Sequence, residues 1–138
     1  MSLKDPRYRL RISTQIVGFM RKVNGDMTVY SRDGSWWSGH KINYREVDEW
    51  TGIKDKHNTF IYEWDIVRYK LDPDGSYQQG VVLWDDHSKE FGICDVNERS
   101  FIPLEIAGVE MFQKNQLEVF SYLFLNPDLQ NRLGARDD

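Results

Sequence analysis

Residues 50–69 read Trp-Thr-Gly-Ile-Lys-Asp-Lys-His-Asn-Thr-Phe-Ile-Tyr-Glu-Trp-Asp-Ile-Val-Arg-Tyr. The polar segment 54–59 lies between two stretches rich in β-branched and aromatic residues, a pattern typical of two strands joined by a tight turn. A further strand is predicted over residues 65–69, because Ile66, Val67 and Tyr69 are good strand formers. This part of the chain therefore predicts a β fold.

The same stretch resembles the signature of the YopX family of phage and prophage proteins. That signature runs roughly Tyr-Thr-Gly-Leu-Lys-Asp-Lys-Asn-Gly, two variable residues and Tyr-Glu-Gly-Asp-Ile-Val. The residues that fall on it without a gap are Thr51, Gly52, Lys54, Asp55, Lys56, Tyr62, Glu63, Asp65, Ile66 and Val67. Weaker similarity continues at 80–84 and 125–129, and residues before about Val47 are expected to match poorly. The resemblance implies an SH3-like barrel in the C-terminal half, but no activity is established for the family as a class.

Two departures from the signature affect the turns. Trp64 stands where the signature has Gly, and His57-Asn58 stands where it has Asn-Gly. Bulky residues avoid positive φ, so we expect an ordinary backbone conformation at Trp64. The signature residues Thr51, Gly52, Lys54 and Asp55 are expected to be architectural, because turn geometry and local hydrogen bonds explain them.

The N-terminal part carries a row of arginines. Tyr8, Leu10 and Ile12 alternate with arginines, which predicts a half-exposed strand whose arginines share one face. We interpret this row as a solvated or edge-strand face, with contact to nucleic acid as the alternative. The row consists of Arg7, Arg9 and Arg11.

Turn signals at 24–26 and 33–34 predict a hairpin around 27–30, and 44–50 fits either a short helix or a strand. Further strands are predicted at 79–84, 91–96 and 117–125, and a helix at 127–133. The expected fold is mainly β with minor α. It comprises a small SH3-like barrel or roll over 50–138 and a smaller α+β or β element over 1–49. One core is expected to contain Ile66, Val67, Val82, Leu83 or Trp84, and Ile93.

Length and charge limit the class of protein. The 138 residues, 40% of them hydrophobic, suffice for one ordinary domain or two small ones. Without an apolar run of about 20 residues or a signal peptide, the expected location is the cytoplasm. Residues 4–22 hold six basic residues and one acidic residue, and the remainder holds twelve basic and twenty-one acidic residues. An acidic body repels phosphate, so nucleic-acid binding is not favoured and would fall to the N-terminal segment.

No catalytic, cofactor or metal site is predicted. Glu63 and Asp65 lie two apart and would share a strand face, but Asp65 opens a strand, where a structural role is expected. The three histidines, His40, His57 and His87, lack the short spacing of metal ligands. A hydrolase or nuclease would need Glu63, Asp65, Asp85 and His87 to meet in one cleft.

Aromatic residues make up 14% of the chain and suggest an interface. Adjacent residues on a strand face opposite sides, so one ring of Trp36-Trp37 is expected outside. The run containing Phe120, Tyr122 and Phe124 is a second candidate contact. We therefore expect a non-enzymatic interaction module that binds a protein partner or itself, most simply as a homodimer.

Overall fold

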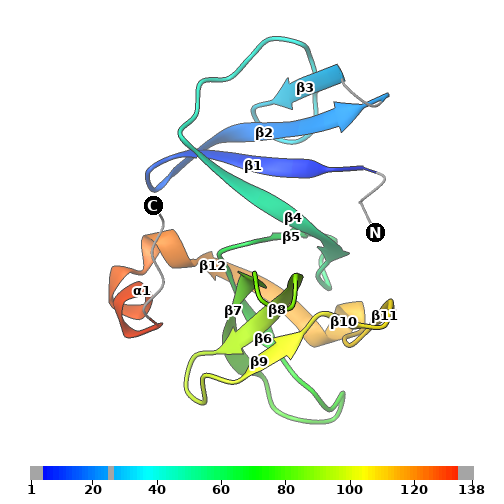
Figure 1. Ribbon diagram of the computed structural model, residues 1–138, viewed down its shortest axis with the longest axis vertical. Helices are drawn as coiled ribbons and strands as arrows, with labels where there is room; N and C mark the ends of the chain where they lie inside the picture. The colour runs from blue at the N-terminus through cyan, green and yellow to red at the C-terminus, as the bar shows by residue number, and fades with distance from the viewer. Residues whose placement is uncertain (1–4, 25–26, 134–138) are drawn as a thin grey trace. The chain divides into compact units, whose positions relative to one another are not determined.

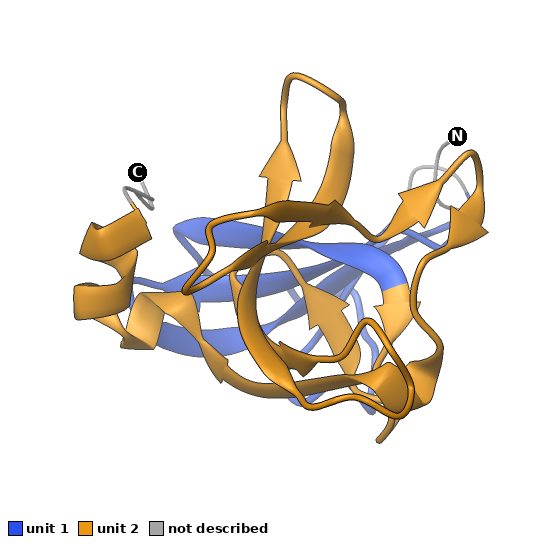
Figure 2. Ribbon diagram, turned by 90° about the horizontal axis from the view of Figure 1, so that it is seen from below, with its two compact units in different colours: residues 1–52 blue, residues 53–138 orange. Residues whose placement is uncertain are grey.

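The computed structural model describes residues 5–24 and 27–133. These residues divide into two compact units, the first ending at Gly52 and the second beginning at Ile53 (Figure 2). The division lies close to the predicted boundary at residue 49. Both units are built mainly from antiparallel strands, so the mainly β prediction is confirmed.

The first unit consists of antiparallel strands (Figure 1). They are β1 (Arg7–Ile12), β2 (Gln15–Val23), β3 (Met27–Ser31) and β4 (Glu46–Lys54), whose last two residues belong to the second unit. The strand order of this sheet is β3-β2-β1-β4-β5, in which β5 (Phe60–Tyr62) belongs to the second unit. The predicted hairpin is confirmed as the β2–β3 pair, although residues 25 and 26 of its turn lie outside the described residues. Residues 46–54 form a strand, which settles the ambiguity at 44–50.

The second unit contains the remaining elements. They are β5 (Phe60–Tyr62), β6 (Asp65–Tyr69), β7 (Gln78–Asp85), β8 (Glu90–Asp95), β9 (Phe101–Pro103), β10 (Glu105–Ile106), β11 (Val109–Glu110), the 3₁₀ turns η1 (Lys114–Gln116) and η2 (Leu123–Leu125), β12 (Leu117–Tyr122) and the helix α1 (Pro127–Leu133). The helix has the predicted bounds. The predicted strand 117–125 ends early, because residues 123–125 form η2.

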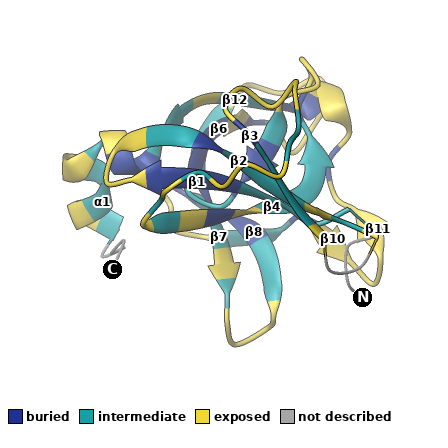
Figure 3. Cartoon of the chain, turned by 90° about the horizontal axis from the view of Figure 1, so that it is seen from above, coloured by how far each residue is buried: buried dark blue, intermediate teal, exposed yellow. Residues whose placement is uncertain are grey.

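The main sheet of the second unit has the order β12-β6-β7-β8-β9. Among the described strands, β12 and β9 are therefore the two edges, and the sheet is open instead of closed into the expected barrel. The SH3-like arrangement implied by the resemblance stays a prediction. The turn between β7 and β8 is exposed (Figure 3), which fits its polar sequence.

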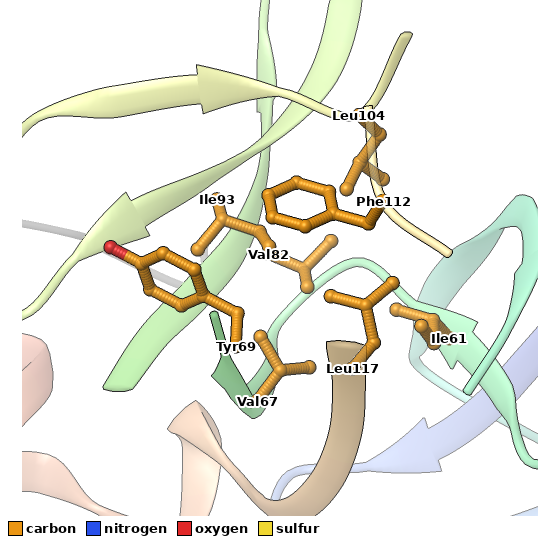
Figure 4. Close-up of a cluster of buried hydrophobic side chains, with 8 residues drawn as sticks. All are labelled: Ile61, Val67, Tyr69, Val82, Ile93, Leu104, Phe112 and Leu117. Carbon is orange, nitrogen blue, oxygen red and sulfur yellow. The ribbon is translucent and has the colours of Figure 1, made fainter. Parts of the chain in front are cut away.

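The core of the second unit has two clusters instead of the one that we predicted. Val67, Val82 and Ile93 lie in the cluster of Figure 4, with Tyr69 and Phe112. Ile66 and Val81 pack in a second cluster with Val96 and Leu123. Successive strand residues point to opposite faces, so Ile66 and Val67 cannot share a cluster. Both faces of β6 and β7 are thus covered by apolar side chains.

Our prediction for the turn before β6 was wrong. Trp64 has a φ of 77°, in the left-handed region that glycine tolerates best. Its N–H donates to the carbonyl of Val82 at 2.8 Å and its carbonyl accepts from the N–H of Leu123 at 2.8 Å, so β7 and η2 fix its backbone. Asn58, which takes the other signature glycine position, has a φ of 63°. Both positions thus keep the conformation that explains a glycine in the signature.

Candidate interaction surfaces

Two of the three arginines in the predicted row are buried in an ion-pair network of the first unit. Arg9 and Arg11 on β1 each donate from Nε to Asp48 Oδ2 on β4 at 2.8 Å. Arg11 also donates from Nη2 to Asp48 Oδ1 at 2.8 Å and from Nη1 to the carbonyl of Ser13 at 2.8 Å. All three charged side chains are buried.

The interpretation of the row as a solvated or edge face is therefore wrong for Arg9 and Arg11. β1 is an inner strand, paired with β2 and with β4, and Arg9 lies opposite Asp48 in register. Alternation alone could not reveal this, because the compensating carboxylate is 37 residues from Arg11 in the sequence. The same burial removes these two guanidinium groups from the surface that nucleic acid would contact.

The third arginine of the row packs on a tryptophan at the surface. Arg7 and Arg21 are opposite each other on β1 and β2, and their guanidinium carbons lie 5.5 Å and 5.3 Å from the centre of the Trp37 ring. Asp5 accepts from Arg7 Nε at 2.9 Å and lies 3.6 Å from Arg21 Nε. Trp36 is 76% exposed. We call Trp36 and Trp37 the tryptophan pair.

The signature turn of the second unit is organised by Asp55, which is buried. Its Oδ1 accepts from the backbone N–H groups of His57 at 2.8 Å and Thr59 at 2.9 Å, and its Oδ2 accepts from that of Val119 at 2.9 Å. The carboxylate thus closes its own turn and fastens it to β12. Gly52, with a φ of 97°, adopts a conformation unfavourable for other residues. Lys54 lies over the ring of Phe60, 4.7 Å from its centre.

The candidate hydrolytic residues have local structural contacts. Asp65 is buried and accepts from the N–H of Tyr62 at 2.8 Å across the turn that contains Glu63. Asp85 accepts from Ser88 Oγ at 2.6 Å and from the N–H of His87 at 3.2 Å. These bonds, chiefly the one from Ser88, lower the pKa of Asp85. Within residues 5–24 and 27–133, no cluster of three or more His, Cys, Asp or Glu could hold a metal ion.

A cleft of about 530 Å³ lies within the second unit. Its lining comes from β7, the segment after β8, the end of η2 and α1. None of the four candidate hydrolytic residues lines it. The lining residues are Gln79, Val96, Asn97, Leu125, Asn126, Pro127, Asp128, Leu129 and Arg132.

The C-terminal aromatic run offers less surface than predicted. Phe124 is buried and Tyr122 half-buried, and their rings stack with centres 5.1 Å apart. Phe124 therefore cannot serve as an interface anchor, because η2 turns the chain after Tyr122 and carries the ring inward. Phe120, which lies at the irregularity in the β12–β6 pairing, is 40% exposed and remains available for contact.

Sequence reasoning named Phe120 as a candidate contact but missed the cations and the second aromatic ring on the surface around it. Arg68 on β6 lies over the Phe120 ring, 4.6 Å from its centre, and the ammonium groups of Lys70 and Lys56 lie 4.6 Å and 5.2 Å from the centre of the Tyr77 ring. Lys114 donates to Asn58 Oδ1 in the signature turn. We call this surface the basic-aromatic face: Lys56, Arg68, Lys70, Tyr77, Lys114 and Phe120.

One carboxylate lies within the basic-aromatic face. Glu118 is 3.7 Å from Lys56 and 3.9 Å from Arg68, and it is 3.2 Å from the ring nitrogen of His57. The sequence contained one signal for this surface, since Arg68 and Lys70 flank the buried Tyr69 at the two-residue spacing of one strand face. That signal does not predict the pairing of β6 with β12, whose residues lie some 50 positions further along the sequence.

A buried hydrogen bond joins β6 to the end of β8. Tyr69 donates to Asp95 Oδ2 at 2.5 Å, and Asp95 Oδ1 accepts from the N–H groups of Asn97 at 2.9 Å and Glu98 at 2.8 Å. Figure 4 shows the Tyr69 oxygen pointing away from the apolar cluster. Burial, together with the bond to Asp95, raises the pKa of Tyr69. Burial opposes ionisation of Asp95, but the hydrogen bonds from Glu98, Tyr69 and Asn97 outweigh it and lower the pKa of Asp95.

Comparison with known proteins identifies the family. A family model described as YopX protein matches residues 14–129. The chain belongs to the YopX family. Neither the curated proteins nor the solved structures contain a significant match to it.

The YopX match also corrects our expectation about its extent. We expected residues before about Val47 to match poorly, but the match begins at residue 14 and includes most of the first unit. The N-terminal strands carry few short motifs, because their β pattern of alternating side chains is common to many sheets. The YopX family relationship thus covers both units.

The described part of the chain contains no helix with the length and apolar character needed to cross a bilayer.

Proposed function

We propose that this YopX family member is a non-enzymatic interaction module of phage or prophage origin that binds a protein partner or a second copy of itself. The observation that carries the proposal is the tryptophan pair, because Trp36 is 76% exposed and the neighbouring Trp37 ring contacts two arginines. Exposed tryptophans are enriched among the residues that dominate binding energy at protein interfaces.

The state of the acidic residues supports a binding role over catalysis. Asp55 and Asp65 accept backbone hydrogen bonds inside the fold, and Asp85 stabilises an exposed turn. General acid–base catalysis needs such a group within reach of a substrate. Asp65 is the first residue of β6 and lies opposite the middle of β7, whereas Asp85 is the last residue of β7, roughly 10 Å further along that strand. This separation does not favour a catalytic pair of the two carboxylates.

The experiment is affinity capture with immobilised protein and its Trp36→Ser variant. We expect the wild-type protein to retain a partner from extracts of the host bacterium and the variant to lose most of it. Val109→Ser is the matched control, because Val109 is 67% exposed on β11 of the other unit. If the wild type and Trp36→Ser retain equal amounts of the partner, the tryptophan pair does not take part in binding it.

A further inference from the structure

We propose that the basic-aromatic face of the second unit binds single-stranded nucleic acid. This inference goes beyond protein binding at the tryptophan pair, and it uses a different unit of the chain. Sites for single strands combine cationic groups that follow the phosphates with aromatic rings that stack on bases. Both kinds of group are present here, and the aromatic ones are partly exposed: Tyr77 is 38% exposed and Phe120 40%.

The contacts show that the face is continuous. Lys114 donates a hydrogen bond to Asn58 in the signature turn. The two residues before Asn58, Lys56 and His57, both contact Glu118. Arg68 lies opposite Glu118 in the β6–β12 pairing, and its guanidinium group lies over the ring of Phe120. Lys56 also lies over the ring of Tyr77, which Lys70 contacts as well. A strand of nucleotides laid across these residues would meet cations and rings in turn.

The local charge favours a polyanion although the unit as a whole is acidic. Residues 53–138 hold nine basic and sixteen acidic residues, a net charge of −7. Four of the nine basic residues lie on this face, with Glu118 as the one acid in contact with them in the described residues. Charges further than about 8–10 Å away are largely screened at physiological salt. Besides Glu118, the exposed loop that joins Lys70 to Tyr77 carries Asp72 and Asp74. The four cations of the face still exceed these three neighbouring acids and favour a polyanion.

The cations that now cover the two rings do not prevent stacking. An exposed cation–π contact contributes about 0.5–1 kcal/mol, whereas a base stacked on an aromatic side chain contributes about 1–3 kcal/mol. A base can therefore displace Arg68 from Phe120, or a lysine from Tyr77. The displaced cation is then within reach of the phosphate next to the stacked base. Replacing the cation by a base on the ring therefore also supplies a phosphate contact.

The test is fluorescence anisotropy with a labelled oligodeoxythymidylate of about 20 nucleotides and the full chain. Each phosphate contact on a single strand contributes about −0.7 to the slope of log affinity against log salt. Four contacts predict that affinity falls roughly 50-fold between about 50 and 200 mM NaCl. The double variant Arg68→Gln, Lys70→Gln should halve that slope and weaken binding at low salt.

Two further variants separate stacking from charge. Phe120→Ala should weaken binding at least about fivefold while leaving the salt slope unchanged, because the ring carries no charge. Lys89→Gln is the matched control for charge, since Lys89 is exposed in the β7–β8 turn and pairs with Asp86 at 2.8 Å. It should bind the oligonucleotide as the wild type does.

The proposal is overturned if the wild type gives no anisotropy change at low salt, or if Lys89→Gln weakens binding as much as the double variant. Equal affinity for a duplex of the same length would also overturn it, because paired bases cannot stack on Phe120 or Tyr77. Trp36→Ser should retain oligonucleotide binding. Failure at the basic-aromatic face would therefore be distinguishable from failure of the tryptophan pair.

Discussion

Trp64 adopts a left-handed backbone conformation at the position where the signature that residues 50–69 resemble has glycine. Its N–H and carbonyl are bonded to β7 and to the start of η2, and the indole packs partly against the cluster of Ile66 and Val81. A side chain with a Cβ costs about 1–2 kcal/mol in this region. The packing of a large ring offsets that cost, which explains how tryptophan can replace glycine.

Trp64→Gly and Trp64→Ala test this explanation, because both remove the indole and differ only in the Cβ. Alanine at positive φ remains strained, so the glycine variant should be the more stable by about 1 kcal/mol, the reverse of the usual order. Urea denaturation measures the difference. Equal stability, or a more stable alanine variant, would mean that Trp64 is not strained in solution.

Asp55 acts at the same scale through its three backbone hydrogen bonds. Asp55→Ala leaves the N–H groups of His57, Thr59 and Val119 without this acceptor, and we expect a loss of about 3 kcal/mol in unfolding free energy. Asp55→Asn retains one acceptor oxygen and should lose less. Chemical denaturation of the two variants would contradict the architectural role if alanine behaved like the wild type.

At the scale of elements, the Tyr69–Asp95 bond links β6 to β8 across β7. Raising the folded-state pKa of Tyr69 stabilises the fold fully below the unfolded pKa of about 10, and this contribution is lost as the pH rises through the folded value. Lowering the pKa of Asp95 acts in the opposite direction. That contribution is present above about pH 4 and is lost as the pH falls through the folded value.

Tyr69→Phe separates this bond from other titrating groups. We expect the variant to lose about 1–3 kcal/mol near neutral pH, because Asp95 loses a buried donor. Between about pH 9 and 11 its stability should fall less steeply than that of the wild type. Urea midpoints measured across this range for both proteins provide the comparison. Parallel curves would show that Tyr69 titrates normally.

Elements that depend on neighbouring residues were the ones predicted correctly. The turn at 54–59, the strands β6 to β8 and the helix α1 were readable because turn residues, alternation and Asn-Pro-Asp act over a few positions. Two long-range contacts could not be predicted from the sequence. One is the pairing of β6 with β12, and the other is the ion pairing of Arg9 and Arg11 with Asp48. Both depend on contacts between residues tens of positions apart, and the basic-aromatic face depends on the first of them.

At the scale of the whole molecule, charge is divided unequally between the two units. Residues 1–52 hold nine basic and six acidic residues, a net charge of +3, against −7 for residues 53–138. The sequence showed the basic N-terminal segment, but burial of Arg9 and Arg11 withdraws two of its charges into the ion-pair network. The first unit thus presents a tryptophan surface with modest charge. The second unit gathers four cations on the basic-aromatic face, while Lys89, Arg99 and Arg132 are exposed outside it.

The tryptophan pair leads to the prediction of a homodimer. Trp36 exposes a large apolar ring, and isologous contact would bury it against a second copy, with more than roughly 1,000 Å² covered in total. In such a contact Arg7 and Arg21 of the two copies would approach each other, so screening by salt should strengthen the dimer. Salt has the opposite effect on oligonucleotide binding. Light scattering at tens of micromolar should report a dimer for the wild type and for Val109→Ser, and a monomer for Trp36→Ser. If the wild type stays monomeric at every protein and salt concentration, the tryptophan pair does not mediate self-association and its partner must be a different protein.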